Sequence, residues 1–255
     1  MSSQSVSQPP VACRSLTKVF DGDRVVDDVS FELEAGTVTG FVGANGAGKT
    51  TTLRMLLGLV APTSGDALVD GRPDRELAAP RRSVGAVLGG PGAHPAHAAR
   101  THLRILATAA GLPLERVVEV IDLVELDAHA GRRVGTFSLG MRQRLALAAA
   151  LLGEPRILLL DEPVNGLDPP GIRWLRWLLR SLADDGRTVL VSSHLLGELA
   201  EIADRVVIID RGRLIADAPL AELMQGQTGS FEDVYFRLAG TLTRPATATD
   251  VRSRP

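Results

Sequence analysis

Two neighbouring carboxylates, Asp161 and Glu162, follow directly on a short apolar segment near the middle of the chain. That segment, Ile157 to Leu160, reads as a strand, and ligands of open parallel sheets bind at the carboxyl edge where the carboxylates lie. Upstream, Ser138-Leu139-Gly140 leads into a helical pattern. The free N–H groups and positive dipole end of a helix start favour an anion. The stretch from Phe137 to Asp168 therefore points to phosphate chemistry.

A glycine-rich loop earlier in the chain fits the pattern G-x-x-x-x-G-K-[ST]. An apolar strand that ends at Val42 precedes it and a helical pattern follows it, which is the context of a P-loop. Backbone N–H groups of such a loop surround the β-phosphate, Lys49 reaches the β and γ oxygens, and the Thr50 hydroxyl is offered to Mg²⁺. The residues expected at the phosphates are Gly43, Asn45, Gly46, Ala47, Gly48, Lys49, Thr50 and Thr51.

Beside a P-loop, the two carboxylates suit two roles. Asp161 is expected to hold Mg²⁺, directly or through water, and Glu162 is the candidate general base for an attacking water. The alternative for both is an ordinary acidic strand end. The guanine-reading pattern Asn/Thr-Lys-x-Asp does not occur in the chain, so ATP is expected in preference to GTP.

Length, charge and hydropathy narrow the class of protein. A chain of 255 residues suits one large α/β domain or two small ones. A net charge of −2 gives no general attraction to nucleic acid, and a single cysteine fits a reducing compartment. The N-terminal residues lack the pattern of a signal peptide. The most apolar run, Leu145 to Leu152, is far shorter than the roughly 20 residues of a membrane-spanning helix, so we expect no crossing of a membrane.

Apolar periodicity predicts a mixed α/β order of elements. Strands are predicted at residues 11–15, 29–33, 38–42, 66–69, 84–88, 157–160, 188–191 and 206–209. Helices are predicted at residues 51–59, 101–110, 114–124, 141–152, 171–183 and 195–203. Early strands pair in an antiparallel manner and later ones alternate with helices, which indicates a parallel core with an antiparallel β layer. The long, mostly helical interval before the strand at 157 reads as an inserted subdomain.

In their order, these motifs resemble those of the ABC ATPases. Phe137-Ser138-Leu139-Gly140-Met141 stands where the family's signature is commonly Leu-Ser-Gly-Gly-Gln, and Asn165-Gly166-Leu167-Asp168 resembles the D-loop. The resemblance implies an α/β fold: a P-loop NTPase core with an antiparallel β subdomain and an inserted α-helical signature subdomain. The implied limits are a disordered N-terminus at 1–10, an ATPase domain at 11–240 with its helical subdomain at about 90–152, and a disordered tail at 241–255.

The resemblance also implies roles for further residues. Ser138 and Gly140 would contact the γ-phosphate of ATP held by an opposite subunit, and Asp168 belongs to the loop that crosses to the opposite P-loop. His194 follows the strand at 188–191 and matches the family's switch histidine, which contacts the γ-phosphate and helps orient the attacking water. Phe20 stands where the family places an aromatic ring on adenine. A buried core phenylalanine is the alternative for that position.

On this resemblance, the chain is expected to bind and hydrolyse ATP, with Mg²⁺, as a subunit of an ABC transporter. A second copy or a homologous ATPase subunit would complete an ATP-sandwich dimer. An integral membrane permease, encoded separately, would hold the chain in the cytoplasm at the inner face of the cell membrane. Segments from His94 to Leu103 and from Ser230 to Phe236 resemble bacterial drug-exporter ATPases, which favours export. No nucleic-acid partner is expected.

Two alternatives and one departure accompany this interpretation. A soluble ABC ATPase of translation or DNA maintenance is one alternative, but this chain has neither a second cassette nor a long coiled coil. An ATP-binding module without turnover is the other, and Glu162 and His194 disfavour it. The departure is Gly89, which stands where the family usually has a Gln after the strand at 84–88. The role of that Gln is therefore not carried over, and the transported substrate is left open.

Overall fold

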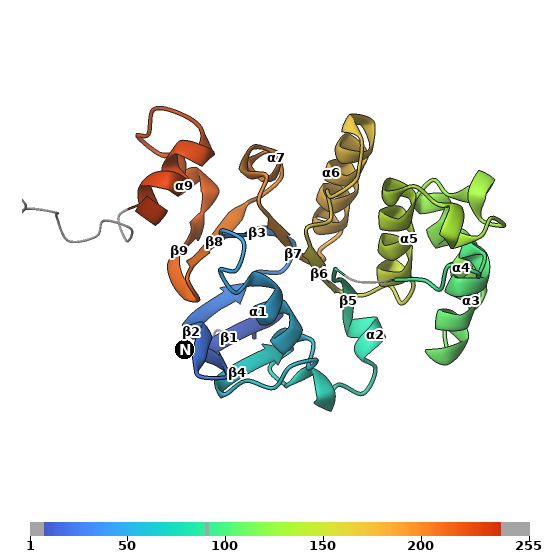
Figure 1. Cartoon of the computed structure of the whole chain (residues 1–255), viewed down its shortest axis with the longest axis horizontal. Helices are drawn as coiled ribbons and strands as arrows, with labels where there is room; N and C mark the ends of the chain where they lie inside the picture. Colours follow the sequence, from blue (N-terminus) through green and yellow to red (C-terminus); the bar gives the residue numbers. More distant parts are fainter. Residues whose placement is uncertain (1–7, 90–91, 241–255) are drawn as a thin grey trace, which may run out of the picture.

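The computed structural model describes residues 8–89 and 92–240 (Figure 1). The disordered tail expected at 241–255 and most of the N-terminal segment expected at 1–10 lie outside the described residues. Within them, two sheets are present, one of six strands and one of three.

The larger sheet is the parallel core that the sequence predicts. It comprises β3 (Val38–Val42), β5 (Val84–Val87), β6 (Ile157–Asp161), β7 (Thr188–Ser193), β8 (Arg205–Asp210) and β9 (Arg213–Pro219). Their order across the sheet is β5-β6-β7-β3-β8-β9, and every neighbouring pair is parallel except β8 and β9. Three loops that leave β3, β6 and β7 therefore emerge at one edge of the sheet.

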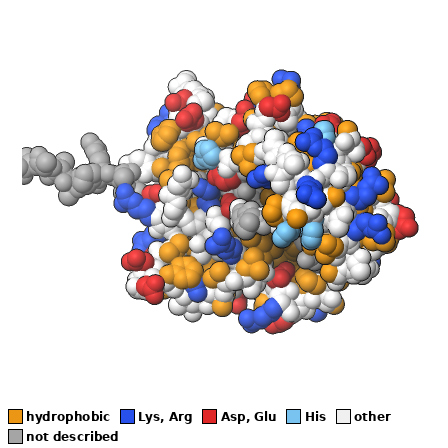
Figure 2. Space-filling view, turned by 45° about the vertical axis from the view of Figure 1, so that its right-hand side comes forward, with side chains coloured by type: hydrophobic (Ala, Val, Ile, Leu, Met, Phe, Trp, Pro, Cys, Tyr) orange, Lys and Arg blue, Asp and Glu red, His pale blue; other side chains and the backbone are white. Residues whose placement is uncertain are grey.

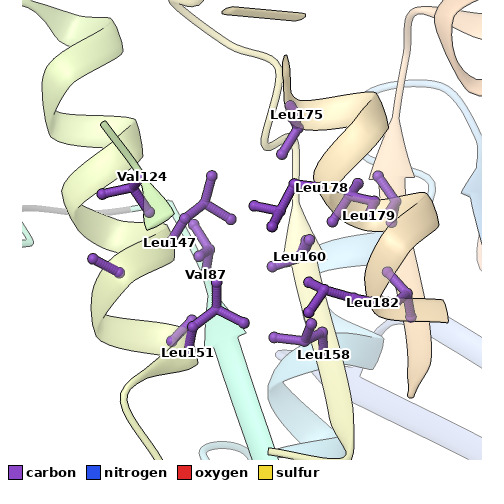
Figure 3. Close-up of a cluster of buried hydrophobic side chains, with 14 of the residues drawn as sticks. Val87, Val124, Leu147, Leu151, Leu158, Leu160, Leu175, Leu178, Leu179 and Leu182 are labelled. Carbon is purple, nitrogen blue, oxygen red and sulfur yellow. The ribbon is translucent and has the colours of Figure 1, made fainter. Parts of the chain in front are cut away.

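Strands β3, β6, β7 and β8 of this sheet are largely apolar because both of their faces are buried. Side chains of a strand alternate between the faces, so Leu158 and Leu160 join one hydrophobic cluster whereas Ile157 and Leu159 join another. The first cluster lies under helices, including α5 (Leu139–Leu151) and α6 (Pro169–Asp184), and Figure 3 shows leucines of both helices turned toward β5 and β6. This packing fixes the position of the end of β6 relative to α5 and α6.

The second cluster lies against a three-stranded antiparallel sheet. It is formed by β1 (Val11–Phe20), β2 (Asp23–Leu33) and β4 (Ser64–Val69) in the order β2-β1-β4, and α1 (Lys49–Leu56) lies beside it (Figure 1). The two sheets meet through apolar contacts such as Phe31 with Phe41, whose ring centroids are 5.6 Å apart. The antiparallel β layer expected from the early strands is therefore present.

Helices between β5 and β6 form a group at one side of the molecule (Figure 1). They are α3 (Ala99–Ala109), α4 (Glu115–Leu123) and α5, in the interval where the sequence predicts an inserted subdomain. The chain then continues through α7 (Leu196–Ala200), α8 (Leu220–Met224) and α9 (Phe231–Gly240), the last of which overlaps the segment that resembles a terminal exporter helix. Figure 2 shows positive and negative side chains intermixed over the face drawn, in keeping with the net charge of −2.

Some element predictions were wrong in extent. The predicted strand at 11–15 continues to Phe20, the predicted helix at 195–203 covers only Leu196–Ala200, and β9, α8 and α2 (Pro80–Ser83) were not predicted. β9 carries Arg213, Asp217 and Pro219 and is only half buried, as edge strands commonly are. It therefore lacks the apolar alternation that identifies a strand in sequence.

Candidate functional site

The site lies where β3, β6 and β7 end side by side. The P-loop follows β3, Asp161 ends β6, and His194 follows β7, which pairs with both of the other strands. An open cleft of about 180 Å³ lies there. Its lining residues are Val25, Ala44, Asn45, Gly46, Ala47, Gly48, Lys49, Thr50, Thr51, Asp161 and Glu162. Among the P-loop residues predicted at the phosphates, only Gly43 lies outside this lining, and its carbonyl accepts a hydrogen bond from Lys49.

The P-loop is shaped by its last glycine. Gly48 has a φ of +104° at the start of α1, a left-handed conformation that side-chain-bearing residues rarely adopt. A Cβ at this position would also lie 2.7 Å from the carbonyl oxygen of Val25, so even a methyl group would collide with the backbone. With glycine there, the loop turns directly into α1 and presents the N–H groups of the helix start to the cleft, as an anion site requires.

Lys49 supplies the positive charge of the cleft. Its side chain is only 7% exposed, and its ammonium donates to the carbonyls of Gly43 at 2.5 Å and Ala44 at 3.3 Å. Burial lowers the pKa of Lys49, while the neighbouring carboxylates of Glu162 and Asp161 act in the opposite direction and raise it. A phosphate in the cleft would add a further anion and favour the charged lysine.

Asp161 is held by two hydroxyl donors. The Thr50 hydroxyl donates to Oδ2 at 2.7 Å, and the Ser192 hydroxyl donates to Oδ1 at 2.5 Å. Thr50 and Asp161 thus bring a hydroxyl and a carboxylate oxygen together at the rim of the P-loop. Small hard cations such as Mg²⁺ prefer oxygen ligands of this kind, so the donor set fits the predicted metal site.

Glu162 has a strained backbone. Its φ of +51° lies in the left-handed region, which costs a residue with a side chain about 1–3 kcal/mol. Two hydrogen bonds hold it there, since its N–H donates to both the carbonyl (3.1 Å) and the hydroxyl (3.0 Å) of Ser192. The turn aims the carboxylate at His194, whose Nδ1 lies 2.6 Å from Oε2 of Glu162. An ionised carboxylate only accepts hydrogen bonds, so Nδ1 carries the proton in this pair.

Besides Val25 in the cleft lining, the sequence reasoning missed Ser192. It is fully buried on β7, directly opposite Asp161 in the strand register, and it contacts both carboxylate residues. Its signal was present, because two consecutive serines end an otherwise apolar strand just before His194. A buried hydroxyl at such a place needs a partner, and the neighbouring strand ends provide it.

The remaining predicted residues lie outside the cleft lining. Ser138 caps α5 by accepting the N–H of Met141 at 3.2 Å, which leaves its O–H free to donate. Asp168 caps α6 by accepting the N–H of Gly171 at 3.0 Å. Phe20 is 43% exposed with the Lys18 ammonium 4.8 Å from its ring centre, so the alternative of a buried core phenylalanine was wrong.

A P-loop, a hydroxyl–carboxylate pair and a glutamate–histidine pair at one sheet edge define a P-loop nucleoside triphosphatase. The family model described as "ABC transporter" matches residues 26–165, more than half of the chain. The ABC transporter ATP-binding protein YhcH of Bacillus subtilis (strain 168) is 43% identical over 79% of this chain and 67% of its own length. The bacitracin transport ATP-binding protein BcrA of Bacillus licheniformis is 42% identical over 82% and 69%.

The solved structure of an ATP-binding subunit of an ABC transporter superposes with a TM-score of 0.81, at 26% identity, over 89% of this chain and 98% of that one. The chain therefore belongs to the ABC transporter ATP-binding proteins, and it is an ATPase with the fold predicted from its motifs. Among the described residues, no helix is both long and apolar enough to span a bilayer.

Proposed function

We propose that this chain binds Mg²⁺ and ATP and hydrolyses the ATP to drive export through a separate permease. The observation that carries this proposal is that the P-loop cleft and the signature residues lie apart within one chain. The chain's own P-loop cleft is lined by Lys49, Asp161 and Glu162 but by none of the signature residues, so a second copy is needed to close the site. Ser138 keeps a free hydroxyl hydrogen for that purpose.

Each residue of the cleft has a role that follows from its surroundings. The P-loop N–H groups and Lys49 bind the phosphates. Thr50 and Asp161 would hold Mg²⁺, which would neutralise phosphate charge when bound. Phe20, exposed at the end of β1, offers its ring to adenine. Asn45, Gly46 and Thr51 contribute to the phosphate cradle from the loop and the first turn of α1.

Glu162 acts as the general base. It accepts a proton from the attacking water at its carboxylate, which Ser192 fixes through the backbone and His194 fixes through Nδ1. The His194 side chain is 48% exposed, and its bond to Glu162 places it beside the cleft, outside the residues that line it. The closing copy excludes water other than the reacting molecule from this space.

We expect partners of two kinds. The second copy, or a homologous ATPase subunit, contributes its Ser138 and Gly140 to the γ-phosphate, and its Asp168 lies in the loop beside them. An integral membrane permease provides the pore and keeps the chain at the inner face of the membrane. The name of the relative BcrA refers to bacitracin transport, which supports the export of a drug-like molecule. The nearly neutral net charge argues against nucleic acid as a partner.

The test is purification of the tagged chain, in mild detergent, from membranes of cells that express it. A multi-spanning membrane protein should co-purify, and phosphate release from ATP by the complex should exceed that of the chain alone. A chain that stays monomeric with ATP and enters no membrane complex, or one that associates with ribosomes or DNA, would overturn the proposal.

A further inference from the structure

The third residue of the signature, usually glycine, is Leu139 here, and it is the first residue of α5. Its side chain is 61% exposed, yet it lies over Gly166 of the D-loop. A Cβ added to Gly166 would overlap Cγ and Cδ2 of Leu139 and would lie 2.9 Å from its Cβ. A glycine at position 139 has no side chain with which to make this contact.

A second contact lies one residue further along. A Cβ at Gly140 would lie 2.9 Å from the carbonyl oxygen of Gly166 and 3.7 Å from Cδ2 of Leu167. Two successive signature residues therefore pack against two successive D-loop residues. These segments are the starts of two helices, since Ser138 caps α5 and Asp168 caps α6.

The D-loop in turn is bonded back to the general base. The N–H of Asn165 donates to the carbonyl of Glu162 at 3.2 Å, and the N–H of Leu167 donates to the carbonyl of Val164 at 3.1 Å. Gly166 sits between these turns with a φ of +80°. A side chain that presses on Gly166 therefore acts on the same short segment that begins at Glu162.

We propose that Leu139 is a positioning residue that joins the signature to the D-loop, so that both approach the second copy as one unit. The contact itself lies within one chain, and only the joint approach to the second copy rests on the proposed function. Its physical basis is steric: Leu139 fills the space that a side chain at position 166 would need, and a tight apolar contact resists relative movement.

A double-mutant cycle tests it with Leu139→Ala, Gly166→Ala and the double variant. Gly186→Ala is the control for backbone strain, because Gly186 has a φ of +89° and open space around a Cβ. Leu114→Ala is the control for loss of an exposed leucine, since Leu114 is 42% exposed in the helical subdomain. Amide hydrogen exchange of residues 164–168 is measured without nucleotide, and ATP-driven dimerisation is measured in the Glu162→Gln background.

We expect Leu139→Ala to raise exchange in the D-loop about tenfold and Leu114→Ala to leave it unchanged. Gly166→Ala should weaken dimerisation about tenfold more than Gly186→Ala does. Adding Leu139→Ala should restore part of that loss, because it removes Cγ and Cδ2, the two atoms that a Cβ at position 166 overlaps most. Unchanged exchange in Leu139→Ala, or strictly additive effects in the cycle, would overturn the positioning role. A Glu162→Gln parent that fails to dimerise would overturn the proposed function, and the exchange data would still decide the contact.

Discussion

Nδ1 of His194 and Oε2 of Glu162 lie 2.6 Å apart, although 32 residues separate them in the chain. The two residues follow neighbouring parallel strands, β7 and β6, whose register places Asp161 opposite Ser192. The glutamate is held in a left-handed conformation by Ser192, and the histidine then orients its carboxylate.

Replacement of His194 by Ala should slow hydrolysis by about 10²-fold, because the carboxylate of Glu162 loses the donor that fixes it. ATP affinity should stay within about threefold of the wild type, since His194 does not line the P-loop cleft. Single-turnover phosphate release and nucleotide titration measure the two quantities separately. A variant that binds ATP poorly but turns over bound ATP at the normal rate would show that His194 serves binding instead.

Removal of the Thr50 hydroxyl should raise the Mg²⁺ concentration needed for half-maximal hydrolysis by about 10- to 100-fold. Thr50→Ala deletes the proposed oxygen ligand together with the hydrogen bond to Asp161. The matched control is Thr108→Ala, an exposed threonine on α3. Thr108→Ala should keep the wild-type Mg²⁺ dependence. If Thr50→Ala also kept it, Thr50 would not be a metal ligand.

A glutamine introduced at position 89 should fit without loss of stability. Gly89 has no atom within 4 Å of an added Cβ and no positive φ, so the side chain enters open space. Because this is the place of the usual family glutamine, Gly89→Gln should change the ATPase rate of the permease complex or its stimulation by transported substrate. Thermal unfolding should match the wild type. A coupled rate identical to that of the wild type would argue that this position takes no part in coupling.

The buried thiol of Cys13 gives a pH-dependent prediction. Burial raises the pKa of this thiol far above its ordinary value, so the folded protein keeps it protonated. In the unfolded chain the Cys13 thiol ionises with a pKa of about 8.5. The contribution of this thiol to the free energy of unfolding is therefore complete below that pH, and above it is lost at about 1.4 kcal/mol per pH unit. Urea unfolding at pH 7 and pH 9.5 should show a smaller loss in Cys13→Ala than in the wild type. Rapid reaction of native Cys13 with a thiol reagent at pH 8.5 would contradict this burial.

Much of the fold and site follows from local sequence. The P-loop and the apolar strand before Asp161 are short-range patterns with a direct physical meaning, so they were predicted. Ser192 forms its hydrogen bonds, and Leu139 contacts Gly166, across long separations in the sequence. Only strand register and helix packing bring these residues together. β9 escaped prediction for the same reason, because its half-buried residues become a strand only by pairing with β8.

We propose that two copies close around ATP held by the P-loop, with Glu162 as the base. Glu162→Gln keeps the size of the side chain and removes its basic carboxylate, and the main-chain bonds to Ser192 are unaffected. Sedimentation of this variant with and without Mg²⁺ and ATP is the most direct measurement. We expect a dimer that forms only with ATP and hydrolyses it about 10²- to 10⁴-fold more slowly than the wild type. A variant that remains monomeric while saturated with ATP, or that hydrolyses ATP at the wild-type rate, would contradict it.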